Sequence, residues 1–188
     1  MQNQENTAVD FVINEVVQRF VKIEPGTFVM GSPEDEPERF ADESQHEVTI
    51  DQGFWMADTV VTQALWQSVM GNNPSYFKDD PQNPVENVSW NDAVKFIAKL
   101  NELYPEYEFD LPTEEEWEYA CRAGTTAAFN TGNTITTDQA NFDGAAIGGV
   151  YRGHTVPVKS FPPNDWGLYE MHGNVWEWTK SDYKEQNE

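Results

Sequence analysis

The chain has 188 residues, and its 33 acidic and 11 basic residues give it a formal net charge of −22 at pH 7. Such a surface excludes nucleic acid and membrane partners, because proteins that bind phosphates neutralise them with Lys and Arg. Aromatic residues make up 13% of the chain, enough apolar mass for one folded domain with a sizeable core.

The composition also indicates a cellular location. The single cysteine, Cys121, excludes an internal disulfide framework and any need for an oxidising compartment. The polar N-terminus has neither a basic region nor an apolar core of the secretory type, and no apolar run is long enough to span a membrane. We therefore expect a cytoplasmic protein. Its acidity suits basic partners or a hard cation, and it also fits a high-salt habitat or a need for solubility.

The N-terminal part is expected to contain one helix and several strands. Apolar residues between positions 11 and 20 recur with helical spacing, which predicts a short amphipathic helix in an N-terminal extension, residues 1–19. The stretch FVKIEPGTFVMGS, residues 20–32, predicts a β-hairpin, because apolar residues alternate on both sides of a Pro-Gly turn. After an acidic loop, HEVTI (46–50) and GFWMADTVVT (53–62) predict two more strands.

Three helices are expected next, each with a recognisable start. Their N-caps are Thr62, Ser89 and Thr113, and they stop at Gly71, Pro105 and Gly124. The third has a capping box, with a glutamate three residues after its threonine. From residue 125 onward no helical period survives, and we expect irregular structure with occasional strands such as TVPV (155–158). The fold class is α+β, rich in loops.

Several single features allow a catalytic and a structural interpretation. Glutamates 114–116 could act as general acids or bases, but acids in the first turn of a helix also offset its dipole, which we favour. Cys121 could be a nucleophile, but its helical register favours packing. The three histidines lack zinc-type spacing, and no phosphate-binding loop or nucleophile elbow is present. We name no catalytic residue.

The stretch NDWGLYEMHGNVWEW, residues 164–178, is the most informative. If Trp176 and Trp178 alternate as on a buried strand, Glu177 faces the other way. A turn at Gly173 would then bring Glu170 towards Glu177. Two carboxylates with turn carbonyls form a plausible Ca²⁺ cage, since Ca²⁺ takes six to eight oxygen ligands. The alternative is that Glu177 is simply solvated and that the turn has no ligand.

Six blocks of the sequence together resemble a known family, the formylglycine-generating enzymes or sulfatase-modifying factors. The likeness runs in order from about residue 20 to residue 183, and it indicates such a domain over residues 20–188, incomplete at its C-terminus. It implies a C-type-lectin-like fold with little regular secondary structure and bound calcium. The blocks are FVKIEPGTFVMGS, VTQALWQSVMGNNPSYF, PVENVSWNDAVKFIAKLN, LPTEEEWEYACRAGT, ANFDG and FPPNDWGLYEMHGNVWEWT.

The resemblance also implies metal ligands. One Ca²⁺ would be held by the side chains of Glu170 and Glu177 and by the carbonyls of Gly173 and Val175. A second family site begins at the positions of Asn141 and Phe142. The aspartate of that second site falls near Val150, which cannot supply a carboxylate, so the second site is a weaker candidate.

The resemblance breaks at the family's catalytic segment. The family enzymes oxidise a sulfatase cysteine to formylglycine with O₂ and a copper ion held by two cysteines that follow GNVWEW, and these 188 residues do not include that pair. We therefore expect no copper here, and we favour a non-catalytic, calcium-stabilised binding or scaffold module with a protein partner or complementing chain. The alternatives are an N-terminal fragment of a copper-dependent formylglycine-generating oxidase, or a sugar-binding lectin.

Overall fold

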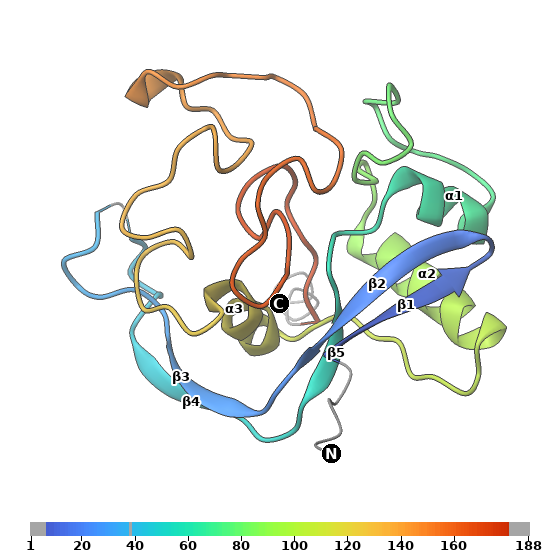
Figure 1. Cartoon of the computed structure of the whole chain (residues 1–188), viewed down its shortest axis with the longest axis horizontal. Coiled ribbons are helices and arrows are strands. Elements are labelled where there is room, and N and C mark those ends of the chain that lie inside the picture. Colours follow the sequence, from blue (N-terminus) through green and yellow to red (C-terminus); the bar gives the residue numbers. More distant parts are fainter. Residues whose placement is uncertain (1–6, 38, 181–188) are drawn as a thin grey trace, which may run out of the picture.

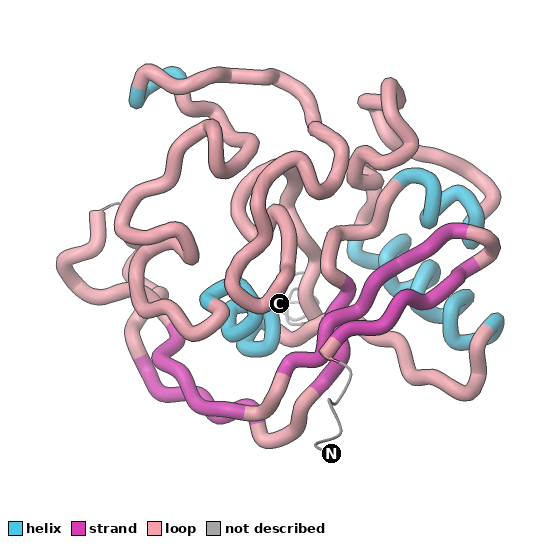
Figure 2. Tube along the Cα trace, in the orientation of Figure 1, coloured by secondary structure: helices cyan, strands magenta, loops and turns pink. Residues whose placement is uncertain are grey.

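The structure is a computed structural model, and it describes residues 7–37 and 39–180. This part of the chain contains two small antiparallel sheets, three α-helices and one 3₁₀ turn, joined by long loops (Figure 2). In Figure 1 the loops after residue 125 run over the upper left and the top of the molecule, and the last of them, in red, lie at the centre beside α3. The α+β, loop-rich character expected from the sequence is therefore observed.

The three-stranded sheet has the order β1-β2-β5, with β1 (Ala8–Ile13), β2 (Val16–Ile23) and β5 (Phe54–Ala57). The helix expected over residues 11–20 is wrong, because β1 and β2 form a hairpin with Val12 opposite Val17. The turn residues Asn14 and Glu15 have φ values of 45° and 71°, as the two-residue turns that suit hairpins require. The apolar spacing was compatible with a helix, but the left-handed turn at Asn14 and Glu15 reverses the chain, so the residues on either side of it pair as strands.

The second sheet pairs β3 (Gly26–Met30) with β4 (His46–Ile50). The hairpin predicted over residues 20–32 is therefore wrong: both halves are strands, but β2 and β3 belong to different sheets. The close approach of β5 to the end of β2 explains this. A Cβ atom on Gly53 would lie 2.8 Å from the Ile23 carbonyl oxygen, so the chain that leads into β5 occupies the side of β2 that a hairpin would need.

The three predicted helices are confirmed as α1 (Gln63–Met70), α2 (Trp90–Leu103) and α3 (Glu114–Arg122). Each predicted N-cap side chain, on Thr62, Ser89 and Thr113, accepts a hydrogen bond from a backbone N–H of the first turn. A short 3₁₀ turn, η1 (Ala145–Ile147), follows later. No helix within residues 7–37 and 39–180 is long and apolar enough to cross a membrane.

Two clusters of buried side chains hold these elements together. The first lies between α1, α2 and the β1-β2 hairpin, where the rings of Trp66 and Phe96 stack with centroids 5.1 Å apart. The second joins both sheets, α3 and the last loop through side chains such as Val21, Ala120 and Leu168. Strand β2 contributes to both clusters, and Figure 1 shows it passing from the α1-α2 side towards α3.

Side chains take the place of strands in the last third of the chain. The strand expected at residues 155–158 does not form. Instead, the side-chain amide of Asn174 imitates a strand partner for Val156: its Nδ2 donates to the Val156 carbonyl and its Oδ1 accepts from the Val156 N–H, both at 3.0 Å. Hydrogen bonds of this kind leave no periodic signal in the sequence.

Gln63 makes a testable contribution to this architecture, because its buried side chain bridges the loop after α1. Its Nε2 donates to the carbonyls of Phe77 and Pro84, at 2.7 and 3.2 Å, and its Oε1 accepts from Asn73. Gln63→Leu would leave these groups buried without partners, so we expect a loss of about 2–4 kcal/mol in the free energy of unfolding, measured in urea.

The matched control is Gln67→Leu, which changes an exposed glutamine one turn along the same helix. We expect that variant to lie within about 0.5 kcal/mol of the parent. Equal losses in the two variants would show that the buried amide does not hold the loop.

Candidate metal site

The candidate site lies where the last loop meets α3. Trp117, on the first turns of α3, donates from its indole Nε1 to Glu177 Oε2 at 2.9 Å. The capping box of Thr113 and Glu116 fixes the start of this helix, as the sequence predicted, and so fixes the position of the indole. This hydrogen bond connects Glu177, in the last loop, to α3.

Asn164 attaches the same loop to α3 from the other side, and the sequence reasoning did not identify it. Its buried Nδ2 donates to the carbonyls of Ala120 and Cys121, at 2.8 and 3.3 Å, which are carbonyls of the last turn of the helix. Its Oδ1 accepts from the N–H groups of Trp166 and Leu168. The only sequence signal for this role is an Asn placed two residues before the Trp-Gly turn.

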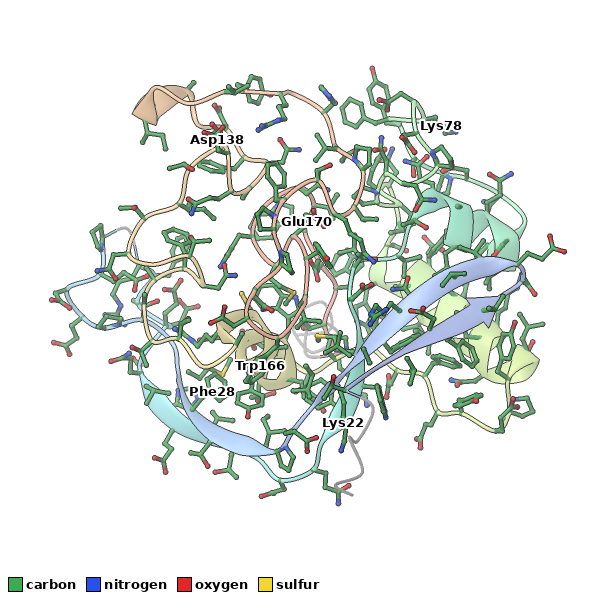
Figure 3. The ribbon with its side chains drawn as sticks, in the orientation of Figure 1. Lys22, Phe28, Lys78, Asp138, Trp166 and Glu170 are labelled. Carbon is green, nitrogen blue, oxygen red and sulfur yellow. The ribbon has the colours of Figure 1, made fainter. Side chains whose placement is uncertain are left out.

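Glu170 is a buried carboxylate held by backbone groups. It is 7% exposed, and it accepts from the N–H groups of Lys159 and Phe161, at 3.0 and 3.3 Å. Its backbone is left-handed, with φ 49°, which an L-residue rarely adopts. Burial raises the pKa of this carboxyl, and the backbone hydrogen bonds oppose that rise. Figure 3 shows Glu170 inside the loops at the centre of the molecule.

Glu177 is a second carboxylate, partly buried where it contacts α3. Burial raises its pKa to about 7, the hydrogen bond from Trp117 opposes the rise, and charge repulsion from Glu170 adds to it. The structure therefore brings the two predicted carboxylates close enough to interact. A cation bound near two carboxylates that repel each other would offset that repulsion.

Gly173 and Val175 form the turn between these carboxylates. The N–H of Val175 donates to the Gly173 carbonyl at 2.8 Å, and Gly173 has φ 76°. Asn141, from a distant segment, packs against this turn: a Cβ atom on Gly173 would lie 2.5 Å from the Asn141 carbonyl oxygen. Only glycine fits at position 173, for both its backbone angle and its contact.

The two tryptophans of the motif behave differently from the expectation. Trp178 is partly buried and donates from Nε1 to the Val88 carbonyl at 3.0 Å. Trp176 is 102% exposed, so the prediction of two buried indoles on a strand is wrong, and this segment is irregular. Glu177 does face away from Trp176, towards α3, as the alternation predicted.

A Ca²⁺ ion at this turn would have two carboxylates as its only charged ligands. Within residues 7–37 and 39–180, no group of three or more His, Cys, Asp or Glu side chains could hold a metal ion. A cation here would depend on two carboxylates completed by the carbonyls of Gly173 and Val175 and by water. An all-oxygen set of that kind suits Ca²⁺ and not a soft transition metal.

The residues of the second candidate site lie next to the first. The Nδ2 of Asn141 donates to the His154 carbonyl at 2.9 Å and to Asn174 Oδ1 at 3.0 Å. The backbone carbonyl of Asn141 accepts from the Asn174 N–H. Val150 is exposed, and its N–H donates to Thr137 Oγ1. Phe142 lines a small hollow beside them.

Cys121 is placed as a packing residue. It is 5% exposed, and its Sγ lies 3.8 Å from Nε2 of His172, which accepts from the Asn130 N–H. Burial raises the pKa of the thiol to about 12 and lowers the pKa of His172. The neutral thiol that results is a poor nucleophile and a poor metal ligand at pH 7.

A larger hollow of about 710 Å³ lies between β2 and residues 159–169. Its cations are paired with acids: Lys159 Nζ lies 2.7 Å from the buried carboxylate of Asp58, and Arg19 lies 3.2 Å from Asp10. Trp166 and Lys22, both labelled in Figure 3, also line it. Because these charges compensate one another, the hollow does not indicate a particular ligand.

The contact at Gly173 generates a prediction. Gly173→Ala adds a methyl group against the Asn141 carbonyl, and its backbone is left-handed, so we expect a loss of about 3 kcal/mol or more in the free energy of unfolding. Gly124→Ala is the matched control, since φ is 85° and no atom lies within 4 Å of the added carbon. We expect the control to lose about 1 kcal/mol in urea unfolding. Similar losses in both would mean that the contact with Asn141 is not tight.

Known proteins similar to this chain were found by both sequence and structure. A formylglycine-generating enzyme of Thermomonospora curvata is 37% identical over 134 residues, which are 66% of this chain and 41% of that protein. The inactive C-alpha-formylglycine-generating enzyme 2 of Bos taurus is 38% identical over an equal length, again 66% of this chain and 41% of that protein. The chain thus spans less than half the length of these two relatives.

Two solved structures match almost the whole chain. Treponema denticola variable protein 1 has a TM-score of 0.79 at 25% identity, covering 93% of this chain and 77% of that one. PvdO from Pseudomonas aeruginosa has a TM-score of 0.76 at 28% identity, covering 93% and 75%. These neighbours confirm the fold class expected from the resemblance, a C-type-lectin-like α+β fold of the formylglycine-generating-enzyme type. A model of the sulfatase-modifying factor enzyme 1-like domain matches residues 9–188, and the chain belongs to that family.

Proposed function

We propose that this chain is a non-catalytic binding module of its family, stabilised by one Ca²⁺ ion. The ion would be held by the carboxylates of Glu170 and Glu177 and the carbonyls of Gly173 and Val175. The observation that carries the proposal is the position of Glu177, a partly buried acid that Trp117 holds against α3, close enough to the buried Glu170 for the charge of Glu170 to raise its pKa. Bound Ca²⁺ would neutralise both charges and fix the turn between them.

The cysteine content supports a non-catalytic role. These 188 residues hold one cysteine, and it is buried beneath the last loop with its thiol protonated. A copper site of the family type needs two thiolates. The similarity to relatives does not separate the alternatives, because inactive and formylglycine-generating relatives match at 38% and 37% identity.

A partner protein or complementing chain is the second part of the proposal. Trp176 projects its whole indole into water, directly beside the ligand Glu177. Tryptophan buries a large area on binding and is enriched among the residues that dominate protein interfaces. The calcium turn would hold that indole in one place for a partner to cover.

The alternative is that the chain is the N-terminal part of a copper-dependent formylglycine-generating oxidase, which converts a sulfatase cysteine to formylglycine. It is favoured by the limited coverage of the relatives, 41% of their length in both cases described above. In that case residues 170–177 would serve the same calcium role within a larger enzyme.

The pKa of Glu177 generates a calcium and pH prediction. Its folded pKa of about 7 exceeds the ordinary value of 4.5, so without metal the folded state holds more protons and loses stability as pH rises from 4.5 to 7. Glu177→Gln removes this loss, and at pH 8 without Ca²⁺ it should be more stable than the parent by about 1–3 kcal/mol. Thermal and urea unfolding at pH 5 and pH 8 measure this.

Added Ca²⁺ should reverse the order of the two proteins. At a concentration of about 100 Kd the parent gains roughly 2.7 kcal/mol, whereas Glu177→Gln gains little. Glu102→Gln, which removes an exposed acid from α2, is the control for net charge and should respond as the parent does. A parent that shows no calorimetric Ca²⁺ binding, or a Glu177→Gln variant that binds equally well, would contradict the calcium site.

The non-catalytic role has its own test. Incubated with copper, O₂ and a sulfatase-type cysteine peptide, the 188-residue chain should leave the peptide mass unchanged, because it offers no pair of thiolates. A formylglycine enzyme with full activity serves as the positive control. Detection of the formylglycine product with this chain alone would overturn the non-catalytic role and leave the calcium site untouched.

A further inference from the structure

The backbone amides that hold the Glu170 carboxylate depend on contacts with a distant part of the fold. The N–H groups of Lys159 and Phe161 donate to Glu170 Oε2 and Oε1, at 3.0 and 3.3 Å. Both amides belong to a turn, residues 158–161, that lies outside every strand and helix of the described chain. The orientation of the carboxylate therefore depends on whatever fixes this turn.

The side chain of Lys159 connects the turn to the sheet. Its Nζ lies 2.7 Å from Oδ2 of Asp58, and it sits over the ring of Tyr169, 5.2 Å from the ring centroid. Asp58 directly follows β5, and its side chain is 2% exposed. One residue thus donates to Glu170 through its backbone N–H and reaches a buried carboxylate through its side chain.

Asp58 is itself fixed on both sides. Its N–H donates to the Arg19 carbonyl at 2.9 Å, and its Oδ1 accepts from Gln18 Nε2 at 3.3 Å, which attaches it to β2. Its carbonyl accepts at 2.8 Å from the N–H of Tyr169, the residue directly before Glu170. Asp58 therefore contacts both segments that surround the Glu170 carboxylate, the turn through its side chain and residue 169 through its backbone.

The backbone is left-handed at both ends of the hydrogen bond between Lys159 and Glu170. The φ angles are 65° and 49°. This conformation is costly for L-residues other than Gly, Asn and Asp, and it persists where surrounding contacts impose it, most often at binding and catalytic sites. Two such residues in one contact indicate that the arrangement around Glu170 serves more than the local preference of the chain.

The ion pair between Asp58 and Lys159 is better suited to orientation than to stability. Asp58 loses hydration on burial, and that loss offsets much of its attraction to the lysine. The Lys159 side chain is 44% exposed, so water screens part of the remaining attraction. In metal sites, by contrast, residues that orient a ligand change the metal affinity by about 10- to 100-fold.

We propose that the ion pair between Asp58 and Lys159 positions Glu170 for the Ca²⁺ ion. The inference rests on the proposed calcium role and adds two positioning residues that lie outside the proposed ligand set. Asp58 holds the amino group, the amino group holds the turn, and the amides of the turn orient the carboxylate. Because the pair is neutral as a whole, it does so without a net positive charge that would repel the cation.

The test compares two double variants, each of which removes one acid and one base and so keeps the net charge. Asp58→Asn with Lys159→Met removes the positioning pair and leaves no buried charge unpaired. Asp10→Asn with Arg19→Gln removes a more exposed pair between β1 and β2 as the control. By titration calorimetry below the melting temperature, the first should bind Ca²⁺ about tenfold or more weakly than the parent, and the control within about twofold.

A second measurement follows Glu170 without metal. The amide proton of Phe161 donates to Glu170, and its NMR chemical shift reports on that hydrogen bond in the parent and in both double variants. We expect this shift to move towards that of a free amide when the Asp58–Lys159 pair is removed, and to stay in place in the control. A pair that only stabilised the fold would lower the melting temperature and leave both the Kd and this shift unchanged.

A single substitution keeps the test decisive if the double variant does not fold. In Asp58→Asn the partly exposed Lys159 side chain can turn to water, and Asp10→Asn is the control with the same change in charge. The same weakening of Ca²⁺ binding and the same movement of the Phe161 shift are expected in Asp58→Asn alone.

Failures of the two proposals can be told apart. If Ca²⁺ binding depends on Glu177 but is equally strong without the Asp58–Lys159 pair, or is weakened equally in the control, the positioning role is overturned and the calcium site remains. Weaker binding with an unchanged Phe161 shift also overturns the positioning role, because the loss would not act through Glu170. A parent that binds no Ca²⁺ overturns the calcium proposal, and the Phe161 shift then decides alone whether the pair orients Glu170.

Discussion

The close contact between Asn141 and Gly173 organises the second half of the molecule. It brings two backbones together where no side chain fits, and the amide of Asn174 extends the contact to Val156. Gly173 belongs to the turn between Glu170 and Glu177, and Asn141 and Asn174 also line the small hollow. Because the loops have no strands in the described part of the chain, these side-chain amides supply the hydrogen bonds that a sheet would otherwise provide.

Local chemistry could be predicted from the sequence, whereas pairing between distant segments could not. The caps at Thr62, Ser89 and Thr113 depend on residues three positions away, and all three helices begin where the caps indicated. The β1-β2 hairpin and the separation of β2 from β3 depend on a two-residue turn and on the approach of Gly53. Apolar spacing alone is compatible with either result, so a helix was predicted over residues 11–20 and β2 was paired with β3.

The candidate site was predictable in part. Alternation placed Glu177 opposite Trp176 correctly, but it reversed the burial, since Trp176 faces water and Glu177 faces α3. Residue spacing alone allowed two interpretations, a calcium cage or a solvated Glu177 beside a turn without a ligand. The proposed set of ligands came from the family resemblance. Asn164 and Trp117 attach the loop to the helix through hydrogen bonds to residues that lie 44 and 60 positions away in the sequence. No local sequence pattern predicts hydrogen bonds between residues so far apart.

The acidic composition and the buried acids have a common consequence. A carboxylate moved out of water loses hydration, and in a chain with a net charge of −22 it gains no compensation from the surrounding field. In the proposed calcium site, a cation bound by Glu170 and Glu177 would supply the missing compensation.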